Sequence, residues 1–283
     1  MQILVHLGFN KCASSYIQHA LAGSQSALRR RGVFYAVEGE RAAQYGLSRY
    51  YGFGPDAEGV TRRSLGWLAA RARERGCGRM IVSSEYLSLG QPDAIATFME
   101  DLRGLGAEAQ FLVFSRDLGP WLSSLFNQYV KTVDGGPFYD SIDSFVSHVL
   151  RNGSIDLARR YRVWVDAAGP DWVTHVRIAE NQADTSVLAP FEAFAGVPVA
   201  PAMGPVNHSL PAGALYLTGR LRQAHRGPLR DRLLTRIAAG GCDWAMAPEG
   251  YLRISAQNMA RLEREIAEPF ARIADAIASG HAA

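Results

Sequence analysis

The sequence predicts an α/β protein with three layers, in which a central parallel sheet lies between two layers of helices. Short apolar runs alternate with stretches of helical periodicity in the part of the chain that precedes Pro211. Strands that alternate with helices form a parallel sheet, because each parallel pair needs a crossover connection. From Pro211 onward the pattern is helical, which predicts a helical C-terminal part. With 283 residues and no shift in composition, we expect one domain over 1–283.

Five apolar stretches supply the predicted strands. The first begins at Ile3 and ends at Gly8, where a glycine lets the backbone turn sharply. The most apolar stretch, Q-F-L-V-F-S at 110–115, suits a strand that is covered on both faces. The other predicted strands lie at 33–36, 79–84 and 172–178.

Helical periodicity fills the stretches between these strands. The first helix is predicted to begin at Ser14 and to end at Gly32, after a last turn rich in arginine. Residues 37–60 show no clear period, and long irregular segments of this kind are often functional. Further helices are predicted at 62–75, 92–104, 120–131, 141–151 and 155–168, and another follows Pro190 and ends near Ala195. From Pro211 the chain is predicted to be helical, with breaks near 227–228 and 240–248. A last helix is predicted at 249–279, with an interruption at Pro269.

The composition excludes several classes of protein. A formal net charge of +3 is too small to indicate nucleic-acid or membrane binding, although it suits a small anionic ligand. The N-terminus lacks the basic and apolar regions of a signal peptide, and no apolar run approaches the ~20 residues of a membrane span. The three cysteines are too widely spaced for a disulfide framework or a zinc site. We therefore expect a cytoplasmic protein that binds neither nucleic acid nor membrane, and the oligomeric state stays open.

The turn between the first strand and the first helix has the features of an anion site. The first turn of a helix carries backbone N–H groups without intrahelical partners and about half a positive charge. A lysine adds a full charge, serines add hydroxyl donors, and small side chains let an oxyanion approach closely. Since hydrogen bonds to charged groups contribute roughly 1.5–3 kcal/mol each, several together hold a phosphate or sulfate firmly. The residues expected at this anion are Lys11, Cys12, Ala13, Ser14 and Ser15.

The turn is not a Walker A loop. That loop places its lysine directly after a second glycine, whereas Lys11 follows Gly8 by three residues and precedes the small residues. From the turn alone, a second interpretation is equally favoured: an ordinary strand–turn–helix in which Ser14 is the N-cap and Lys11 is solvated. The residues that follow other strands bear on this choice.

Charged side chains follow two further strands at the edge of the sheet where parallel strands bind ligands. Arg116 follows the strand 110–115, and Ser124 comes eight residues later, in the next helix. A guanidinium fork and a hydroxyl group there would hold a second anionic group. Glu85 follows the strand 79–84 and is a candidate general base. In the alternative interpretation, both charged residues are ordinary surface groups.

Two segments resemble those of PAPS-dependent sulfotransferases of the bacterial type, where PAPS is 3′-phosphoadenosine 5′-phosphosulfate. The family's 5′-phosphosulfate loop, usually P-K-[ST]-G-T-T, is similar to G-F-N-K-C-A-S-S-Y-I-Q, with Asn10 and Ala13 at the Pro and Gly positions. The family's 3′-phosphate site, R-[DN]-P-x-x-x-x-x-S-x-Y, is similar to F-L-V-F-S-R-D-L-G-P-W-L-S-S-L-F-N-Q-Y-V-K, with the same interval of eight. The resemblance spans most of the chain, and these two motifs are its specific part.

The resemblance implies a P-loop NTPase-like fold and a sulfotransferase that uses PAPS without a metal. The sulfuryl group would move in line from PAPS to a hydroxyl or amine of a small-molecule or glycan acceptor. Lys11 would contact the 5′-phosphosulfate and stabilise the leaving phosphate oxygen, and Arg116 with Ser124 would bind the 3′-phosphate. Because several carbohydrate-type members use a glutamate at the end of the strand R-M-I-V-S-S-E, Glu85 would take the proton of the acceptor.

Several alternatives stay open at this point. His208, in N-H-S-L, is the other candidate base, since its loop could close over the site. A P-loop kinase-type phosphotransferase would need a Walker A Lys–Ser/Thr pair and a metal-holding aspartate, and neither is evident. A non-catalytic nucleotide-binding protein would keep the fold. The aromatic residues of the irregular segment either line an acceptor pocket or cover the core; they are Tyr45, Tyr50, Tyr51 and Phe53.

Overall fold

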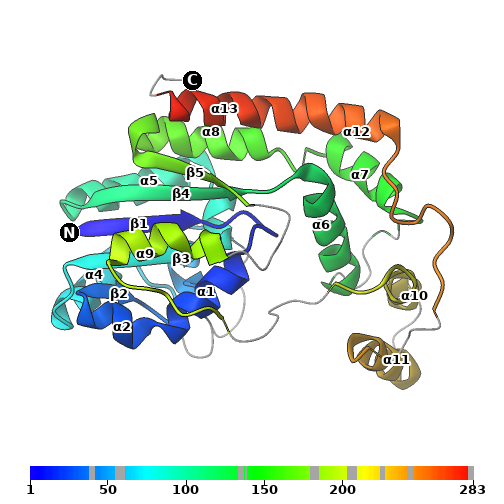
Figure 1. Cartoon of the computed structure of the whole chain (residues 1–283), viewed down its shortest axis with the longest axis horizontal. Helices are drawn as coiled ribbons and strands as arrows, with labels where there is room; N and C mark the ends of the chain where they lie inside the picture. Colours follow the sequence, from blue (N-terminus) through cyan, green and yellow to red (C-terminus); the bar gives the residue numbers. More distant parts are fainter. Residues whose placement is uncertain are drawn as a thin grey trace. The chain divides into compact units, whose positions relative to one another are not determined.

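The central element of the protein is a five-stranded sheet with the strand order β2-β3-β1-β4-β5 (Figure 1). The structure is a computed structural model that describes residues 1–37, 42–54, 61–132, 137, 139–153, 155–178, 185–202, 209–223, 227–240 and 245–279. The strands are β1 (Gln2–Leu7), β2 (Val33–Tyr35), β3 (Arg79–Ser84), β4 (Glu108–Ser115) and β5 (Val173–Arg177). Every neighbouring pair is parallel. The predicted α/β class with a central parallel sheet is confirmed.

Strand β1 occupies the centre of the sheet because its side chains suit burial on both faces. Its isoleucine, leucines and valine are no more than 1% exposed. The register pairs Leu7 with Ser84 of β3 and with Val113 of β4. The segments that follow these three strands therefore begin at the same edge of the sheet.

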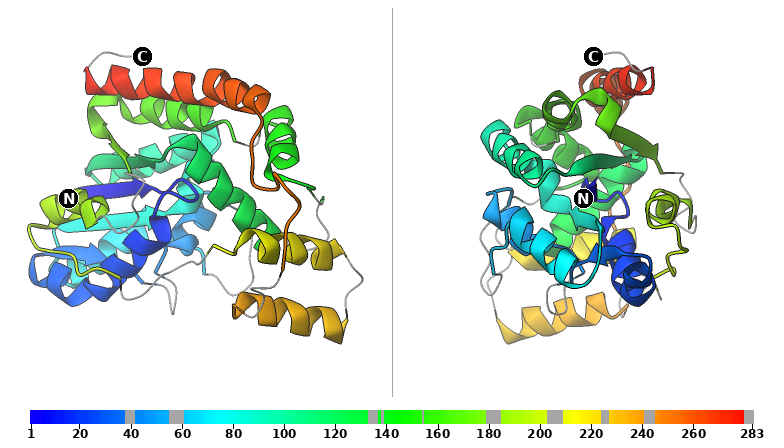
Figure 2. Two further views of the ribbon diagram at one scale, coloured as in Figure 1. Left: turned by 45° about the vertical axis from the view of Figure 1, so that its right-hand side comes forward. Right: turned by 90° about the vertical axis from the view of Figure 1, so that its left-hand side faces the viewer.

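Helices cover both faces of the sheet (Figure 2), which confirms the predicted three layers. One face carries α1 (Ser14–Gly23), α2 (Gln25–Arg30) and α9 (Ala189–Ala195), and the other carries α4 (Leu65–Glu74), α5 (Pro92–Gly104) and α8 (Leu157–Ala168). On the second face, the indole of Trp164 packs beside Phe98 and Phe111 and donates a hydrogen bond of 3.0 Å to the carbonyl oxygen of Leu87. Short 3-10 helices stand at Glu85–Leu89 (η1), Pro170–Trp172 (η2) and Thr185–Leu188 (η3).

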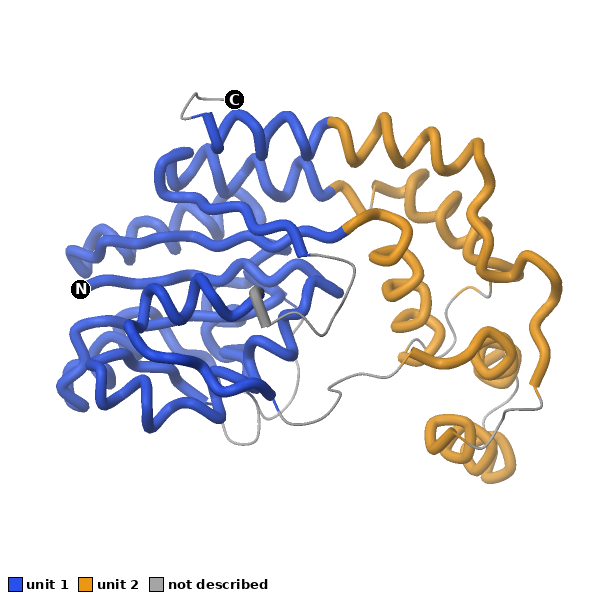
Figure 3. Tube along the Cα trace, viewed as in Figure 1, with its two compact units in different colours: residues 1–116, 157–206, 269–283 blue, residues 117–156, 207–268 orange. Residues whose placement is uncertain are grey.

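The chain divides into two compact units, which Figure 3 colours separately. The first unit comprises 1–116, 157–206 and 269–283 and holds the whole sheet. The second comprises 117–156 and 207–268, and its helices confirm the predicted helical C-terminal part. The expectation of one domain is not tested by this division. Helices of the second unit are α6 (Leu118–Thr132), α7 (Ile142–Arg151), α10 (Ala212–Gln223), α11 (Pro228–Ala238), α12 (Ala256–Leu262) and the π-helical turn η4 (Glu263–Ala267).

The second unit has an aromatic core of its own. The ring of Phe126 lies 5.3 Å from that of Phe145 and 5.6 Å from that of Tyr251. Beside it, the side-chain amide of Asn127 donates to the carbonyl oxygen of Leu210 over 3.2 Å and accepts from its N–H over 3.4 Å. In the described part of the chain, no helix is long and apolar enough to cross a membrane.

The structure differs from the predicted helices at three places. The first helix is broken at Ser24, whose hydroxyl oxygen accepts a hydrogen bond of 2.9 Å from the N–H of Ala200. The segment expected to be irregular contains a helix, α3 (Tyr45–Tyr50). The last helix starts only at Ala256, with Ser255 as its N-cap. Around the predicted interruption, the π-helical turn η4 precedes α13 (Glu268–Ala278), because Pro269 offers no N–H to the ladder and would clash with a regular preceding turn.

Candidate functional site

The turn between β1 and α1 places two residues other than glycine in the left-handed backbone region. Lys11 has φ of 66°, and Ala13 has φ of 59°. For a residue with a Cβ atom this conformation costs about 1–2 kcal/mol. Strain of this kind persists only where the surrounding structure enforces it, and it gathers at ligand sites. Ala13 thus keeps the conformation that glycine favours, at the position where the resembled motif has glycine.

Helix α1 begins without a side-chain cap. Its N-cap residue is Ala13, whose methyl side chain offers no acceptor to the N–H groups of the first turn. Ser14 is 3% exposed, and its hydroxyl donates to the carbonyl oxygen of Phe9 over 3.3 Å. The interpretation of Ser14 as the N-cap is therefore wrong. Because no described side chain caps the first turn, its N–H groups keep the capacity for an oxyanion that the sequence predicted.

Gly8 brings the turn and the end of β3 into close contact. A Cβ atom at this position would lie 2.7 Å from Oγ of Ser14 and 3.1 Å from Cα of Glu85. The N–H of Gly8 donates to the carbonyl oxygen of Ser84 over 3.3 Å. Gly8 is thus required for close approach at the point where β1 ends, and it sets the spacing between the β1–α1 turn and Glu85.

Glu85 is a mostly buried carboxyl group beside the turn. Burial raises the pKa of Glu85, and this effect outweighs the hydrogen bond from Tyr45 and the charge of Lys11, which both lower it. A glutamate with a raised pKa holds a proton more readily, which suits a group that accepts one from a weakly acidic hydroxyl. The structure therefore brings the predicted base and the predicted lysine within electrostatic reach of each other.

Tyr45 is held beside Glu85 by its neighbour Gln44. The Tyr45 hydroxyl donates to Oε1 of Glu85 over 3.3 Å. Gln44 is fully buried; its N–H donates to the carbonyl oxygen of Ser83 over 3.1 Å, and its Nε2 donates to that of Ala36 over 2.8 Å. It therefore ties α3 to the ends of β2 and β3. Sequence reasoning placed Tyr45 in an acceptor pocket or over the core, and no local pattern signals its pairing with a residue that lies 40 positions later.

Arg116 lies at the end of β4 with part of its guanidinium unsatisfied. Its Nε atom is buried and has no hydrogen-bond partner in the part of the chain that the structure describes. Burial raises the pKa of Cys12 to about 12, and the nearby Arg116 charge opposes that shift. Two conclusions follow. Cys12 is a neutral thiol rather than a nucleophile, and a positive charge with an unused donor lies close to the turn, where an anion would supply the missing acceptor.

His6, inside β1, belongs to the core. It is fully buried, and its Nδ1 shares a hydrogen bond of 2.8 Å with Oγ of Ser83. Its ring packs edge-on against Phe114 and Phe191. Burial lowers the pKa of His6 to about 3. A histidine that is neutral and sealed from solvent is packed structure, as the sequence indicated, rather than a catalytic base.

The remaining predicted residues fall into three groups. Ser124 lies on α6, which belongs to the second unit, so its pairing with Arg116 stays a prediction. His208 lies outside the described residues, and its role as a rival base also stays a prediction. Tyr51 and Phe53 are core residues, 7% and 1% exposed.

Among the residues that the structure describes, no group of three or more histidine, cysteine, aspartate or glutamate side chains is placed to hold a metal ion.

Comparisons with known proteins give a structural likeness. No protein-family model matches the chain. A comparison with curated proteins finds no match either. Among solved structures, the chain is similar to the crystal structure of a sulfotransferase from Alicyclobacillus acidocaldarius, with 17% sequence identity, a TM-score of 0.45, and coverage of 93% of this chain and 95% of that chain.

Proposed function

We propose that this chain is a sulfotransferase that moves a sulfuryl group from PAPS to a hydroxyl or amine of a small-molecule or glycan acceptor. One observation carries the proposal. Glu85, a carboxyl group with a raised pKa, lies against a strained, uncapped helix N-terminus that also presents Lys11. A proton acceptor beside an oxyanion site is the arrangement that transfer of an anionic group to a hydroxyl requires.

The donor has two anionic ends, and the described residues fit them. The first turn of α1 offers N–H groups to one end, and Lys11 adds its charge there. The buried Nε of Arg116 has no hydrogen-bond partner among the described residues, so it favours an anionic ligand at the second end. Ser124 would complete that second site, as the motif predicts.

The chemistry follows from the charges. PAPS supplies a sulfuryl group bonded to a phosphate oxygen; the acceptor oxygen or nitrogen forms a bond to sulfur while the bond from sulfur to that phosphate oxygen breaks. Glu85 accepts the proton that the acceptor loses. Lys11 stabilises the negative charge that gathers on the leaving phosphate oxygen. Positioning supplies much of the rate in such transfers, which explains why Gly8 must hold the turn and Glu85 in contact.

Binding measurements separate this function from a phosphotransferase. We expect adenosine 3′,5′-bisphosphate to bind more tightly than AMP or ATP in titration calorimetry, by about 100-fold, because two charge-assisted contacts are added. Arg116→Gln should remove most of that preference. Arg30→Gln, which removes an exposed arginine of α2, is the matched control and should leave it intact. An absence of preference for the 3′-phosphate would overturn the proposal, and tighter binding of ATP would favour the phosphotransferase.

Turnover separates it from a non-catalytic nucleotide-binding protein. PAPS should be consumed in the presence of an acceptor drawn from phenols, sugars, amines and alkyl alcohols, and the reaction is followed by the release of adenosine 3′,5′-bisphosphate. Tight binding of the bisphosphate without transfer to any of these classes would favour the non-catalytic alternative.

A further inference from the structure

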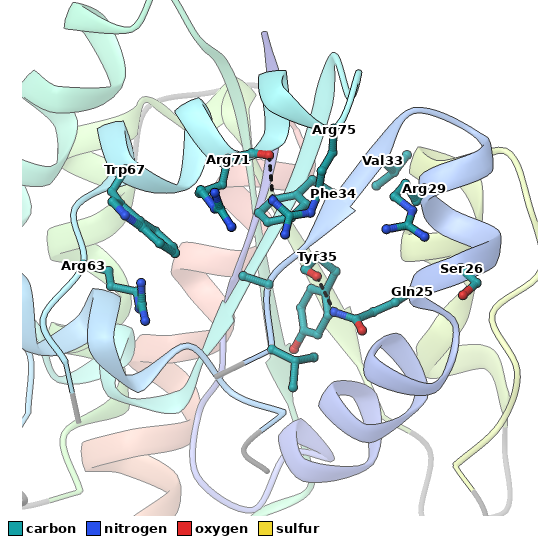
Figure 4. Close-up of a pocket in the computed structure, with 12 residues that line it drawn as sticks. Gln25, Ser26, Arg29, Val33, Phe34, Tyr35, Arg63, Trp67, Arg71 and Arg75 are labelled. Atoms are coloured by element: carbon teal, nitrogen blue, oxygen red, sulfur yellow. Dashed lines mark hydrogen bonds between the residues drawn. The ribbon is translucent and has the colours of Figure 1, made fainter. Parts of the chain in front are cut away.

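A cavity lined by four arginines lies at the free edge of β2, apart from the turn described above (Figure 4). Its volume is about 360 Å³. Its charged lining consists of Arg29, Arg63, Arg71 and Arg75, and none of the twelve described residues that line it is acidic. None of them belongs to the β1–α1 turn or to the ends of β3 and β4. The cavity is therefore a separate, strongly cationic site within the first unit.

The cations are arranged along one side of the cavity in a row. Three arginines and one tryptophan recur every four residues, so they form one stripe along α4 and its flanks: Arg63, Trp67, Arg71 and Arg75. The last two arginines are one helical turn apart, about 6 Å along the axis. Arg29 of α2 lies across the cavity from Arg63 and Trp67 in Figure 4. Gathering like charges in this way costs energy unless an anion offsets it.

In the described part of the chain, aromatic rings and a backbone carbonyl hold two of these guanidinium groups, those of Arg63 and Arg75. Arg63 lies 4.0 Å from the ring centre of Trp67, and Arg75 lies 5.4 Å from that of Phe34. Arg75 also donates to the carbonyl oxygen of Arg71 over 3.3 Å. A stacked guanidinium keeps its N–H edge for an oxyanion while its planar face is supported. Among the four, an ion pair with a carboxylate is present for Arg71, with Glu74 at 2.6 Å.

The edge strand explains part of this charge. Strand β2 pairs with β3 on one side, and on the other side Nε2 of Gln25 donates to the carbonyl oxygen of Tyr35 over 2.7 Å. Charged side chains commonly protect such edges from pairing with other chains. Protection needs charge alone, whereas here two guanidinium groups are fixed on Trp67 and Phe34 around a cavity. Fixed geometry is what recognition of a ligand requires.

We propose that this cavity binds an elongated oligoanion, a chain that carries several phosphate or sulfate groups. An arginine fork binds two oxygens of one phosphate or sulfate group through two parallel hydrogen bonds. The row along α4 calls for anionic groups at repeated intervals rather than one compact ion. Arg29, on the other helix, would contact the same chain from the opposite wall. The site requires neither PAPS nor Glu85, so it is independent of the proposed transfer reaction.

Titration calorimetry with two probes tests the site and separates its two chemistries. A linear pentaphosphate represents the phosphate chains, and a fully sulfated tetrasaccharide represents the sulfate chains. At low salt, at least one should bind about 100-fold more tightly than inorganic phosphate or sulfate, because the linked groups bind as one molecule. Affinity should fall as ionic strength rises.

Paired variants locate the binding. Arg63→Gln with Arg75→Gln should weaken binding of the preferred probe by about 10-fold or more, as charge-assisted contacts are lost. Arg30→Gln with Arg73→Gln removes the same charge from exposed positions of α2 and α4 outside the cavity and should change affinity less than twofold, roughly the scatter for distant sites. Thermal unfolding of both variants confirms that they fold, and an intact affinity for adenosine 3′,5′-bisphosphate keeps this test separate from the proposed function. Equal weakening by both pairs, or no saturable binding of either probe, would overturn the proposal.

Discussion

The hydroxyl of Tyr45 donates a hydrogen bond to Oε1 of Glu85 over 3.3 Å, and this contact joins α3 to the end of β3. The rings of Tyr45 and Tyr86 pack beside it, with their centres 5.1 Å apart. Burial raises the pKa of Glu85, while Tyr45 and Lys11 limit the rise. The basicity of the proposed base is thus set jointly by an apolar environment and two polar neighbours.

Replacing Glu85 by glutamine tests its role as the base. Glu85→Gln keeps the shape of the side chain and removes its proton affinity, so we expect turnover to fall by roughly 10²–10⁴-fold. Binding of adenosine 3′,5′-bisphosphate should change little, since the proposed donor site consists of the turn and Arg116. Steady-state kinetics and calorimetry on the same preparation check both parts. Near-normal turnover would transfer the role to His208.

Tyr45→Phe tests the control of the Glu85 pKa. The Tyr45 hydrogen bond lowers that pKa, so its removal should raise it. A base with a higher pKa is deprotonated only at higher pH, and the acidic limb of kcat/KM should therefore shift upward in pH. Tyr50→Phe, an exposed tyrosine at the end of the same helix, serves as the control and should leave the profile in place. A shift to lower pH would contradict the assignment.

Gly8→Ala tests the close contact between the turn and Glu85. The added Cβ would meet Oγ of Ser14 at 2.7 Å and Cα of Glu85 at 3.1 Å, so backbone must move. We expect a loss of about 1–3 kcal/mol in the free energy of unfolding, as for other overpacked sites, together with lower turnover. Gly23→Ala, where no atom lies within 4 Å, should instead stabilise the end of α1 by about 0.5–1 kcal/mol. Urea denaturation of the two variants measures the contrast, which would be lost if Gly8 were merely a flexible turn residue.

Ala13→Gly tests the strain in the turn. Glycine adopts the left-handed conformation freely, whereas alanine at φ of 59° is strained. Removing this backbone strain should stabilise the folded state by about 1–2 kcal/mol. This gain exceeds the cost of the greater conformational entropy that glycine gives the unfolded chain, which is about 0.4–1 kcal/mol. We therefore expect a small increase in the midpoint of thermal unfolding. A decrease would show that Ala13 contributes contacts that outweigh its strain.

His6 predicts how stability depends on pH. Its pKa is lowered to about 3 in the folded protein, whereas the unfolded chain has the ordinary value near 6.5. The unfolded state therefore binds more protons between these values, and the stability contributed by neutral His6 is lost as pH falls below about 6.5. For each unit by which the pH falls in this range, the free energy of unfolding should decrease by up to about 1.4 kcal/mol more than that of His6→Gln. Urea denaturation at several pH values measures it, and parallel curves for both proteins would refute the prediction.

Glycine and proline at the ends of helices and strands made much of the fold predictable from the sequence. The bounds of β3 at Arg79–Ser84 and of α5 at Pro92–Gly104 agree with the prediction, because a buried apolar run and an N-terminal proline are local signals. The turn between β1 and α1 was likewise predicted, since its lysine and small residues are contiguous, and its role in anion binding stays a prediction. Glu85 was placed correctly at a strand end because parallel strands share one ligand-binding edge.

Contacts between distant residues were decided only by the tertiary structure. The break at Ser24 depends on Ala200, and the position of α3 depends on the hydrogen bonds of Gln44 to Ser83, so neither has a local pattern. The pairing of Tyr45 with Glu85 belongs to the same class. Side chains that are far apart in the chain come into contact only once the sheet has formed. Hydrophobic periodicity and composition therefore do not predict these contacts.

The β1–α1 turn shows which features the sequence determined and which the tertiary structure decided. Sequence alone determined that Lys11 and the small residues open a helix after a buried strand. The tertiary structure decided that Ala13 takes a left-handed backbone, that Ser14 faces Phe9 instead of capping the helix, and that Gly8 rests against Glu85. The reason is energetic: backbone strain of this size is retained only where neighbouring strands hold the chain in place, and those neighbours come from distant parts of the sequence.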